Sequence, residues 1–265
     1  MADPFEHVVD QKNWQIFESL HLGLRLPWFL TKYMVLELIA AAVVVAIFVP
    51  LARQAQGGEP VKGKFWNAFE SLLTFVRDQV VRPCIGEHDA DRFMPFFWTL
   101  FLFILFCNLL GMFPFMGSPT ASISVTGALA LCTFCLIHGT AIFHMGLGKY
   151  IISQAPHMEV PFGLGYFLVP MIIVLELFGH VIKSIVLAVR LFANMFAGHT
   201  VLAFILMFIV MAKNAGVLTS GGITVARVVG SAVLSLLELF VAFLQAYIFV
   251  FLASLFLGMV LHPEH

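Results

Sequence analysis

Long apolar runs constrain this chain most, because a helix needs about 20 predominantly apolar residues to cross the hydrocarbon core of a membrane. Apolar residues make up 61% of the chain and charged residues 11%, against about 45–50% and about 25% in soluble domains. The runs and the composition together predict an all-α membrane protein with a single membrane domain over residues 1–265. The expected spans are 33–52, 94–115, 121–145, 165–212 and 222–260.

Shorter features predict how the first spans are connected. The turn signal Gly117-Ser118-Pro119 between the second and third spans predicts an antiparallel helical hairpin of neighbouring helices. Residues 64–82 place apolar side chains at helical spacing, with charged and polar residues on the other side. This segment is predicted to be an amphipathic helix on the membrane surface, and packing against another subunit is the alternative. Asn108 in the second span is expected to form an interhelical hydrogen bond.

The last two runs are too long for upright spans. Residues 165–212 would form a helix of roughly 70 Å at about 1.5 Å per residue, more than twice the thickness of the bilayer core. The middle of this run, 181–200, contains no proline and no polar loop cluster. We therefore expect one steeply tilted helix, with a kink near Pro170, Gly179 or Gly198. A turn over 213–222 would lead to a second such helix over 222–260, which pairs with the first as a tilted hairpin.

The charge distribution indicates an orientation. The formal net charge is −1, which argues against nucleic acid as a partner. Five spans put the termini on opposite sides, and an outside N-terminus gives the inner segments seven basic residues against four in the outer ones. The positive-inside rule thus favours an external N-terminal segment, 1–32, and a cytoplasmic C-terminus.

Ionisable residues recur inside the long spans, where each costs about 2.5 to 3.5 kcal/mol at a helix centre. At 100° per residue, five polar side chains of the first long helix fall within one stripe about 27 Å long. His199 falls on a different face, whereas Glu238 and Gln245 of the last helix share a face with each other. The residues of the stripe are Glu176, His180, Lys183, Arg190 and Asn194.

Two interpretations of the stripe stay open on spacing alone. It can line a hydrated path, or Glu176 can pair internally with His180 or Lys183, at i+4 and i+7. Arg190 differs, because no carboxylate lies three or four residues from it. Its counter-charge must come from elsewhere in the chain or from another subunit.

Other candidate sites have less support. Cys132 and Cys135 form a C-x-x-C within an apolar run, which favours packing over metal or redox chemistry. His138 and His144 lie about 120° apart around a helix, a poor geometry for shared metal ligation. No P-loop or hydrolase motif is present in the sequence, so no cofactor or metal is expected. A membrane metalloenzyme would need a third ligand beside His199 and Glu238.

Two sequence segments carry a family resemblance. VLAVRLFANMFAGHT (186–200) and LELFVAFLQAYIF (237–249) resemble the signature helices of subunit a of the F-type ATP synthase. The resemblance extends to the five spans, the amphipathic helix after the first span and the FCNLLGMFPF ending (106–115) of the second. It therefore covers nearly the whole chain. A self-contained ion-coupled secondary transporter is the alternative, but it would usually show inverted repeats, and none is visible.

The resemblance implies a stator subunit with two offset half-channels that conduct protons to and from the carboxylates of a rotating c-ring. Its implied partners are the c-ring, the peripheral-stalk b subunits, the rest of the ATP synthase complex and membrane lipid. Its implied location is the bacterial inner membrane. In the family, the arginine that matches Arg190 faces the ring. Glu176 and Lys183 match positions of the inner half-channel, and Asn194, Gln245, His199 and Glu238 match positions of the outer half-channel.

One pair departs from the commonest bacterial pattern. The residue nine positions after the arginine is commonly Glu and the residue seven positions before the glutamine is commonly His, whereas here they are His199 and Glu238. A reciprocal exchange keeps one acid and one imidazole, which favours a proton-relay pair over two independent residues. The family suggests no role for His180.

Overall fold

The computed structural model describes residues 32–55, 63–112, 118–153, 165–211 and 217–261, and within them it is helical without strands. The spans expected from sequence correspond to five helices long and apolar enough to cross a membrane. They are α2 (Lys32–Ala55), α5 (Glu87–Gly111), α6 (Ile123–Met145), α8 (Gly165–Met211) and α9 (Val217–Leu261). An all-α membrane protein is confirmed.

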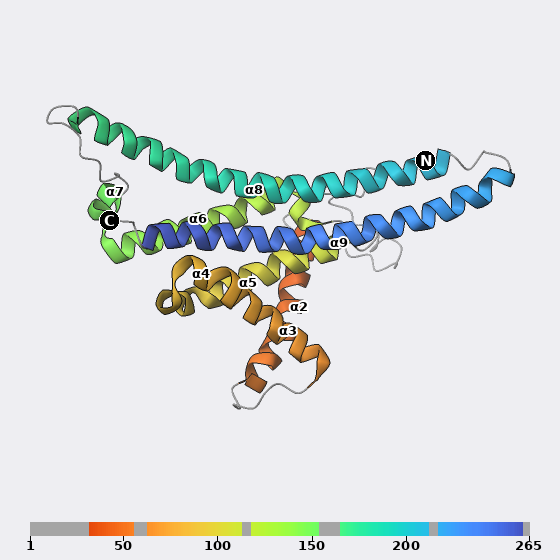
Figure 1. The fold of residues 1–265 in the computed structure, drawn as a ribbon, viewed down its shortest axis with the longest axis horizontal. Helices are drawn as coiled ribbons and strands as arrows, with labels where there is room; N and C mark the ends of the chain where they lie inside the picture. The colour runs from red at the N-terminus through yellow and green to blue at the C-terminus, as the bar shows by residue number, and fades with distance from the viewer. Residues whose placement is uncertain (1–31, 56–62, 113–117, 154–164, 212–216, 262–265) are drawn as a thin grey trace.

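The two over-length helices lie side by side along the longest dimension of the molecule (Figure 1). α8 has 47 residues and runs without interruption through Pro170, Gly179 and Gly198. α9 has 45 residues and begins at Val217, five residues before the expected start. The expected turn over 213–222 is therefore wrong in its second half, because Gly221 and Gly222 are accommodated inside the helix. α2 crosses the long pair steeply (Figure 1).

The helices α5 and α6 do not form the predicted hairpin of neighbours. α5 packs mainly on α9 and α2, whereas α6 packs mainly on α8 and also touches α9. The connection between them contains a short 3-10 helix, η2 (Pro119–Ala121), whose residues are buried against α5 and α8. A Cβ on Gly111 would lie 2.4 Å from the Cβ of Ser118, so the connection approaches the end of α5 too closely for a larger residue. The buried end of the connection, Ser118–Ala121, thus packs beside α5, and α5 and α6 pack mainly on different helices.

Small residues allow α9 to pack closely inside the bundle. Ala242, Ala246 and Ala253 are fully buried along one face, and the face continues to Leu257. At Gly258, a Cβ would lie 2.0 Å from the carbonyl oxygen of Cys84, so only glycine permits this approach. Membrane helices have little hydrophobic drive to associate, and close contact of this kind supplies the van der Waals attraction instead.

The segment after α2 is not one surface helix over 64–82. It divides into α3 (Lys64–Phe75), a π-helix η1 (Val76–Val81) and α4 (Arg82–Ile85). α3 has no buried residues, as a surface helix would, whereas three valines of η1 are fully buried and η1 contacts α5 and α9. The second half of the segment is therefore part of the core. These buried valines are Val76, Val80 and Val81.

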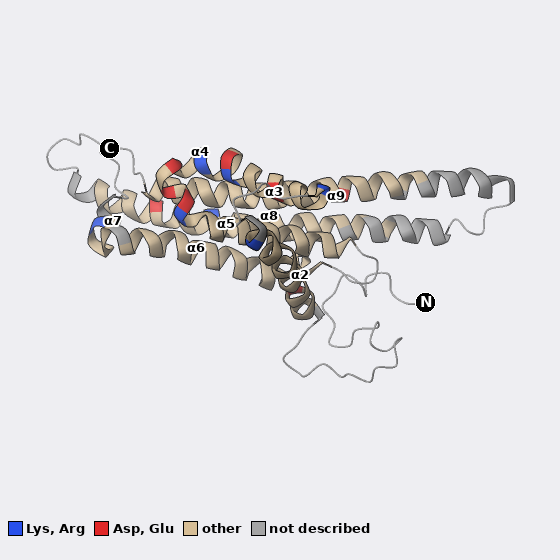
Figure 2. Ribbon diagram, turned by 90° about the horizontal axis from the view of Figure 1, so that it is seen from below, with Lys and Arg blue, Asp and Glu red and all other residues tan. Residues whose placement is uncertain are grey.

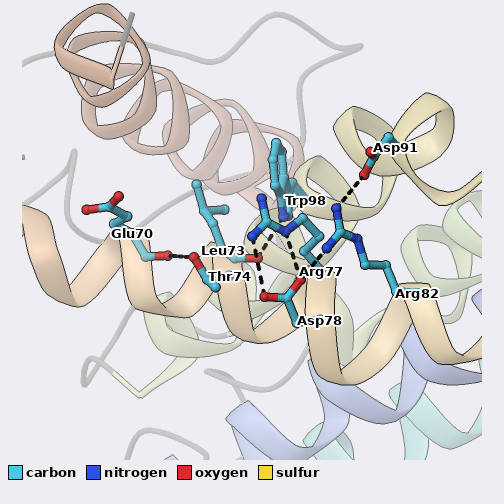
Figure 3. A network of polar contacts seen from close by, with 8 residues as sticks. All are labelled: Glu70, Leu73, Thr74, Arg77, Asp78, Arg82, Asp91 and Trp98. Atoms are coloured by element: carbon cyan, nitrogen blue, oxygen red, sulfur yellow. Dashed lines mark hydrogen bonds and ion pairs between the residues drawn. The ribbon is translucent and has the colours of Figure 1, made fainter. Parts of the chain in front are cut away.

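Ion pairs cover the outer side of this buried segment (Figure 3). Asp78 accepts hydrogen bonds from Arg77 at 2.9 Å and from Arg82 at 3.2 Å, and Arg82 also pairs with Asp91 of α5 at 3.2 Å. The Arg77 hydrogen bond and the two nearby cations lower the pKa of Asp78 below its usual value. Its pairing therefore contributes at neutral pH and is lost as the pH falls through that lowered pKa. The described charges gather around α4 and the start of α5, whereas α6 and α9 are mostly uncharged (Figure 2).

Candidate functional site

Arg190 lies in the middle of α8 with its side chain exposed. Its neighbours Leu187 and Leu191 are 2% and 0% exposed and pack into the core, so the buried face of α8 lies directly beside it. Within the described residues, no carboxylate lies within ion-pair distance of the guanidinium. Arg190 therefore has no carboxylate partner in the described part of the chain, either on α8 or on another helix.

One helical turn beyond Arg190, a hydrogen bond joins the two long helices. The Asn194 side-chain amide donates to Oε1 of Gln245 at 2.6 Å. Gln245 is fully buried, and its Nε2 has no hydrogen-bond partner among the described residues. A buried amide N–H without a partner costs about 1–3 kcal/mol. The structure thus joins two predicted site residues and leaves a free donor beside them.

Glu238 lies against the same part of α8. Its side chain is 9% exposed, and a Cβ built on Gly198 would lie 3.7 Å from its Oε1. The Glu238 carboxylate therefore faces α8 at Gly198, directly before His199, and leaves room there for no more than a small side chain. The side chain of His199 lies outside the described residues, so its contact with Glu238 stays a prediction.

Asn108 joins α5 to this region. Its amide donates to the carbonyl oxygen of Ala242 on α9 at 3.2 Å, which confirms the expected interhelical bond. Its Oδ1 accepts from Thr120 at 2.6 Å, and the Thr120 hydroxyl is 2.6 Å from that of Ser118. All three side chains are buried. Sequence reasoning missed Ser118 and Thr120, because a buried 3-10 turn has no apolar periodicity.

Nearer the start of α8, the structure contains the internal pair that spacing allowed. Lys183 Nζ lies 3.7 Å from Glu176 Oε1, and both side chains are partly exposed, at 35% and 46%. His180 Nδ1 lies 2.9 Å from the backbone oxygen of Glu176, so this hydrogen bond does not involve the carboxylate. His180 is 6% exposed.

The predicted residues therefore fall into two groups on either side of an exposed cation. Glu176 and Lys183 form one group, about 21 Å along α8 before Arg190 counted from Glu176. Asn194, Gln245 and Glu238 form the other, one to two turns after it. Within the described residues, no cluster of three His, Cys, Asp or Glu side chains could hold a metal ion.

This arrangement defines a multi-span membrane protein in which two long helices carry separated polar groups through an apolar interior. Residues 34–258 match the protein family described as ATP synthase A chain. This match covers most of the sequence, and the chain belongs to that family. Family membership gives no support to the alternative of a self-contained transporter.

Individual relatives agree with the family match. The chain is 36% identical to ATP synthase subunit a of Myxococcus xanthus over 89% of its own length and 74% of that protein. It is 40% identical to ATP synthase subunit a of Anaeromyxobacter dehalogenans, over 91% of this chain and 60% of the relative. It is 36% identical to the Chloroherpeton thalassium protein of that name, over 99% of this chain and 78% of the relative. The chain thus spans about 60 to 80% of these relatives.

Proposed function

We propose that this chain is the stator subunit of an ATP synthase membrane sector, which provides two offset half-channels for protons. It carries protons to and from carboxylates on a rotating c-ring and so couples proton flow to rotation and ATP synthesis. The partners are the c-ring, the peripheral-stalk b subunits and the rest of the complex. The protein is located in the bacterial inner membrane, with its N-terminus outside and its C-terminus in the cytoplasm.

The exposed Arg190 carries this proposal. A guanidinium at mid-membrane depth needs a counter-charge, and the described residues supply none. A carboxylate on a second subunit that slides past α8 would meet this need. A nearby cation favours the ionised carboxylate, so a protonated ring site would release its proton on approach. Arginine does not readily deprotonate, so it also blocks a direct leak between the half-channels.

Each of the two polar groups lines one half-channel. Glu176 and Lys183 line the inner one, where both are partly open to the surroundings. Asn194, Gln245, His199 and Glu238 line the outer one. The Gln245 donor, which has no partner among the described residues, would hydrogen-bond water there. Carboxylate and imidazole groups take up and release protons, which favours H⁺ over Na⁺ as the coupling ion.

Photo-crosslinking tests the contact with the ring. Val186 lies one turn before Arg190 and is 46% exposed, so a photo-reactive amino acid there should capture the ring subunit in the assembled complex. Leu131 on α6 is 62% exposed and serves as the matched control, which should capture lipid only. Crosslinked products are identified by mass spectrometry of purified complex. If both positions capture the ring equally, or if neither captures it, the proposed contact between the ring and the Arg190 side of α8 is contradicted.

Glu176→Gln should slow proton pumping without uncoupling it. The carboxylate is 46% exposed, so water beside it can still carry protons once its charge is removed. We expect a loss of about three- to tenfold, below the roughly 10²-fold attributed to an acid or base at the reacting atom. The measurement is ATP-driven acidification of inverted vesicles over a range of pH. An unchanged rate at every pH would reduce Glu176 to a structural partner of Lys183.

A further inference from the structure

A second buried polar cluster lies beside Glu176 and has no role in the function proposed above. It consists of three side chains from three helices: His138 of α6, Tyr150 of α7 (Leu147–Ser153) and His180 of α8. They are 9%, 4% and 6% exposed. Polar side chains this deep in an apolar bundle are costly, and packing alone would be better served by apolar residues.

The three side chains form a continuous chain of contacts. Nδ1 of His138 is hydrogen-bonded to the Tyr150 hydroxyl at 2.5 Å. The ring of His138 lies against the ring of His180, with centroids 5.0 Å apart and planes nearly perpendicular. His180 in turn is bonded to the backbone of Glu176. The cluster therefore leads from α7, across α6, to the Glu176 and Lys183 pair.

The backbone bond determines which nitrogen of His180 can exchange a proton. A carbonyl oxygen only accepts hydrogen bonds, so Nδ1 of His180 carries the hydrogen and donates it. The Nε2 of His180 is then the atom that gains and loses a proton. Since the bond to Glu176 stays in place in both states, the ring can change charge without losing its position.

The surroundings of His180 contain few other ionisable groups. α6 contributes His138, α7 contributes Tyr150, and α8 itself contributes Glu176 and Lys183. On the side of α9, Lys183 Nζ lies 5.5 Å from the centre of the uncharged ring of Phe256. The cluster is thus linked to the Glu176 pair by the hydrogen bond from His180 Nδ1 to the backbone oxygen of Glu176.

We propose that His138, Tyr150 and His180 form a proton-collecting branch of the inner half-channel that delivers protons to Glu176. The proposal rests on the function proposed above. A proton arriving at the Tyr150 oxygen displaces the hydroxyl proton onto Nδ1 of His138, and His138 releases a proton from Nε2 toward His180. Protonated His180 then gives up its Nε2 proton to the Glu176 carboxylate. Each step breaks one O–H or N–H bond and forms another, and no other bond changes.

Tyr150 is suited to the first step. Burial and the nearby Glu176 carboxylate both raise the pKa of its hydroxyl above the usual value. The hydroxyl therefore keeps its proton at neutral pH and can both accept and donate a hydrogen bond. A tyrosinate at this position would interrupt the chain.

His180→Asn is the direct test, because the asparagine amide can still donate to the Glu176 carbonyl but cannot titrate. Inverted vesicles expose the inner half-channel to the medium, so the medium pH sets the supply of protons. ATP-driven acidification should fall about three- to tenfold at about pH 8.5, where protons are scarce, and little at about pH 6.5. Tyr150→Phe should change the pH profile in the same direction, because it removes only the hydroxyl.

Two controls separate this mechanism from packing and from failure of the proposed function. Phe134 packs on the His138 ring at 4.1 Å between centroids and has no ionisable group, so Phe134→Leu should leave the pH profile unchanged. Arg190→Ala in the same preparation should abolish coupled pumping. If it does and His180→Asn keeps the wild-type profile, the branch is refuted while the proposed function stands. If Arg190→Ala still pumps, both are refuted. If the complex with His180→Asn does not assemble, the pH profile of Tyr150→Phe tests the proposal instead, and a wild-type profile refutes the branch.

Discussion

Arg190→Ala is expected to abolish ATP synthesis and ATP-driven proton pumping while ATP hydrolysis by the detached catalytic sector continues. We expect a loss of at least about 100-fold, the scale found when one preorganised electrostatic group is removed from a reaction site. The physical reason is that Arg190 is the exposed charge between two polar groups, and no described carboxylate neutralises it. Without it, a ring carboxylate would have no reason to ionise on reaching α8.

The matched control for this prediction is Arg53→Ala. Arg53 is an exposed arginine in the last turn of α2, far in sequence from the polar groups of α8 and α9, and its loss should leave coupled synthesis near wild type. Arg190→Lys should restore coupling only in part, since an ammonium held between α8 and the ring at membrane depth can lose its charge. Normal synthesis by the Arg190→Ala complex would refute the assignment.

The spans and the Glu176 pair could be predicted because both depend on local spacing. Apolar runs of 20 or more residues require membrane helices whatever their neighbours are, and five such helices are present. Glu176 and Lys183 are seven residues apart on one face of a helix, so spacing allowed the 3.7 Å contact that the structure contains, beside the alternative of a hydrated path. Arg190 could be recognised as a candidate site residue for the opposite reason, because no carboxylate lies three or four residues from it on the helix.

The helix packing could not be predicted from spacing. The short turn signal after α5 indicated neighbouring helices, but Pro119, Thr120 and Ala121 are buried between α5, α6 and α8, and α9 packs against both α5 and α6. The contact of His138 with Tyr150 depends on the chain direction after α6. Gly146 sets that direction with φ +79°, a conformation that few residues other than glycine adopt. Such contacts depend on backbone turns that hydrophobic periodicity does not report.

His199 and Glu238 are the proposed relay residues of the outer half-channel. The family resemblance implies that acid and imidazole have exchanged places at His199 and Glu238 relative to the commonest pattern. The structure adds that the Glu238 carboxylate approaches α8 at Gly198, directly before His199, and that Glu238 is buried. A functional pair would explain both the exchanged residue types and the approach of Glu238 to Gly198, and this pairing is a proposal that the next experiment tests.

His199→Ala and Glu238→Ala should therefore each cut proton flux strongly, by about 100-fold or more, because each interrupts the relay and leaves a lone ionisable group at membrane depth. The double exchange His199→Glu with Glu238→His restores both groups in reversed order. The double exchange should recover more flux than either single exchange, His199→Glu or Glu238→His. Two ionisable groups in contact titrate as a coupled pair, so the effect of changing one depends on the other. ATP-driven acidification of inverted vesicles for the two single exchanges and the double measures this coupling. Strictly additive losses would show that the two residues act independently, and Glu238 would then be only a buried side chain that faces α8.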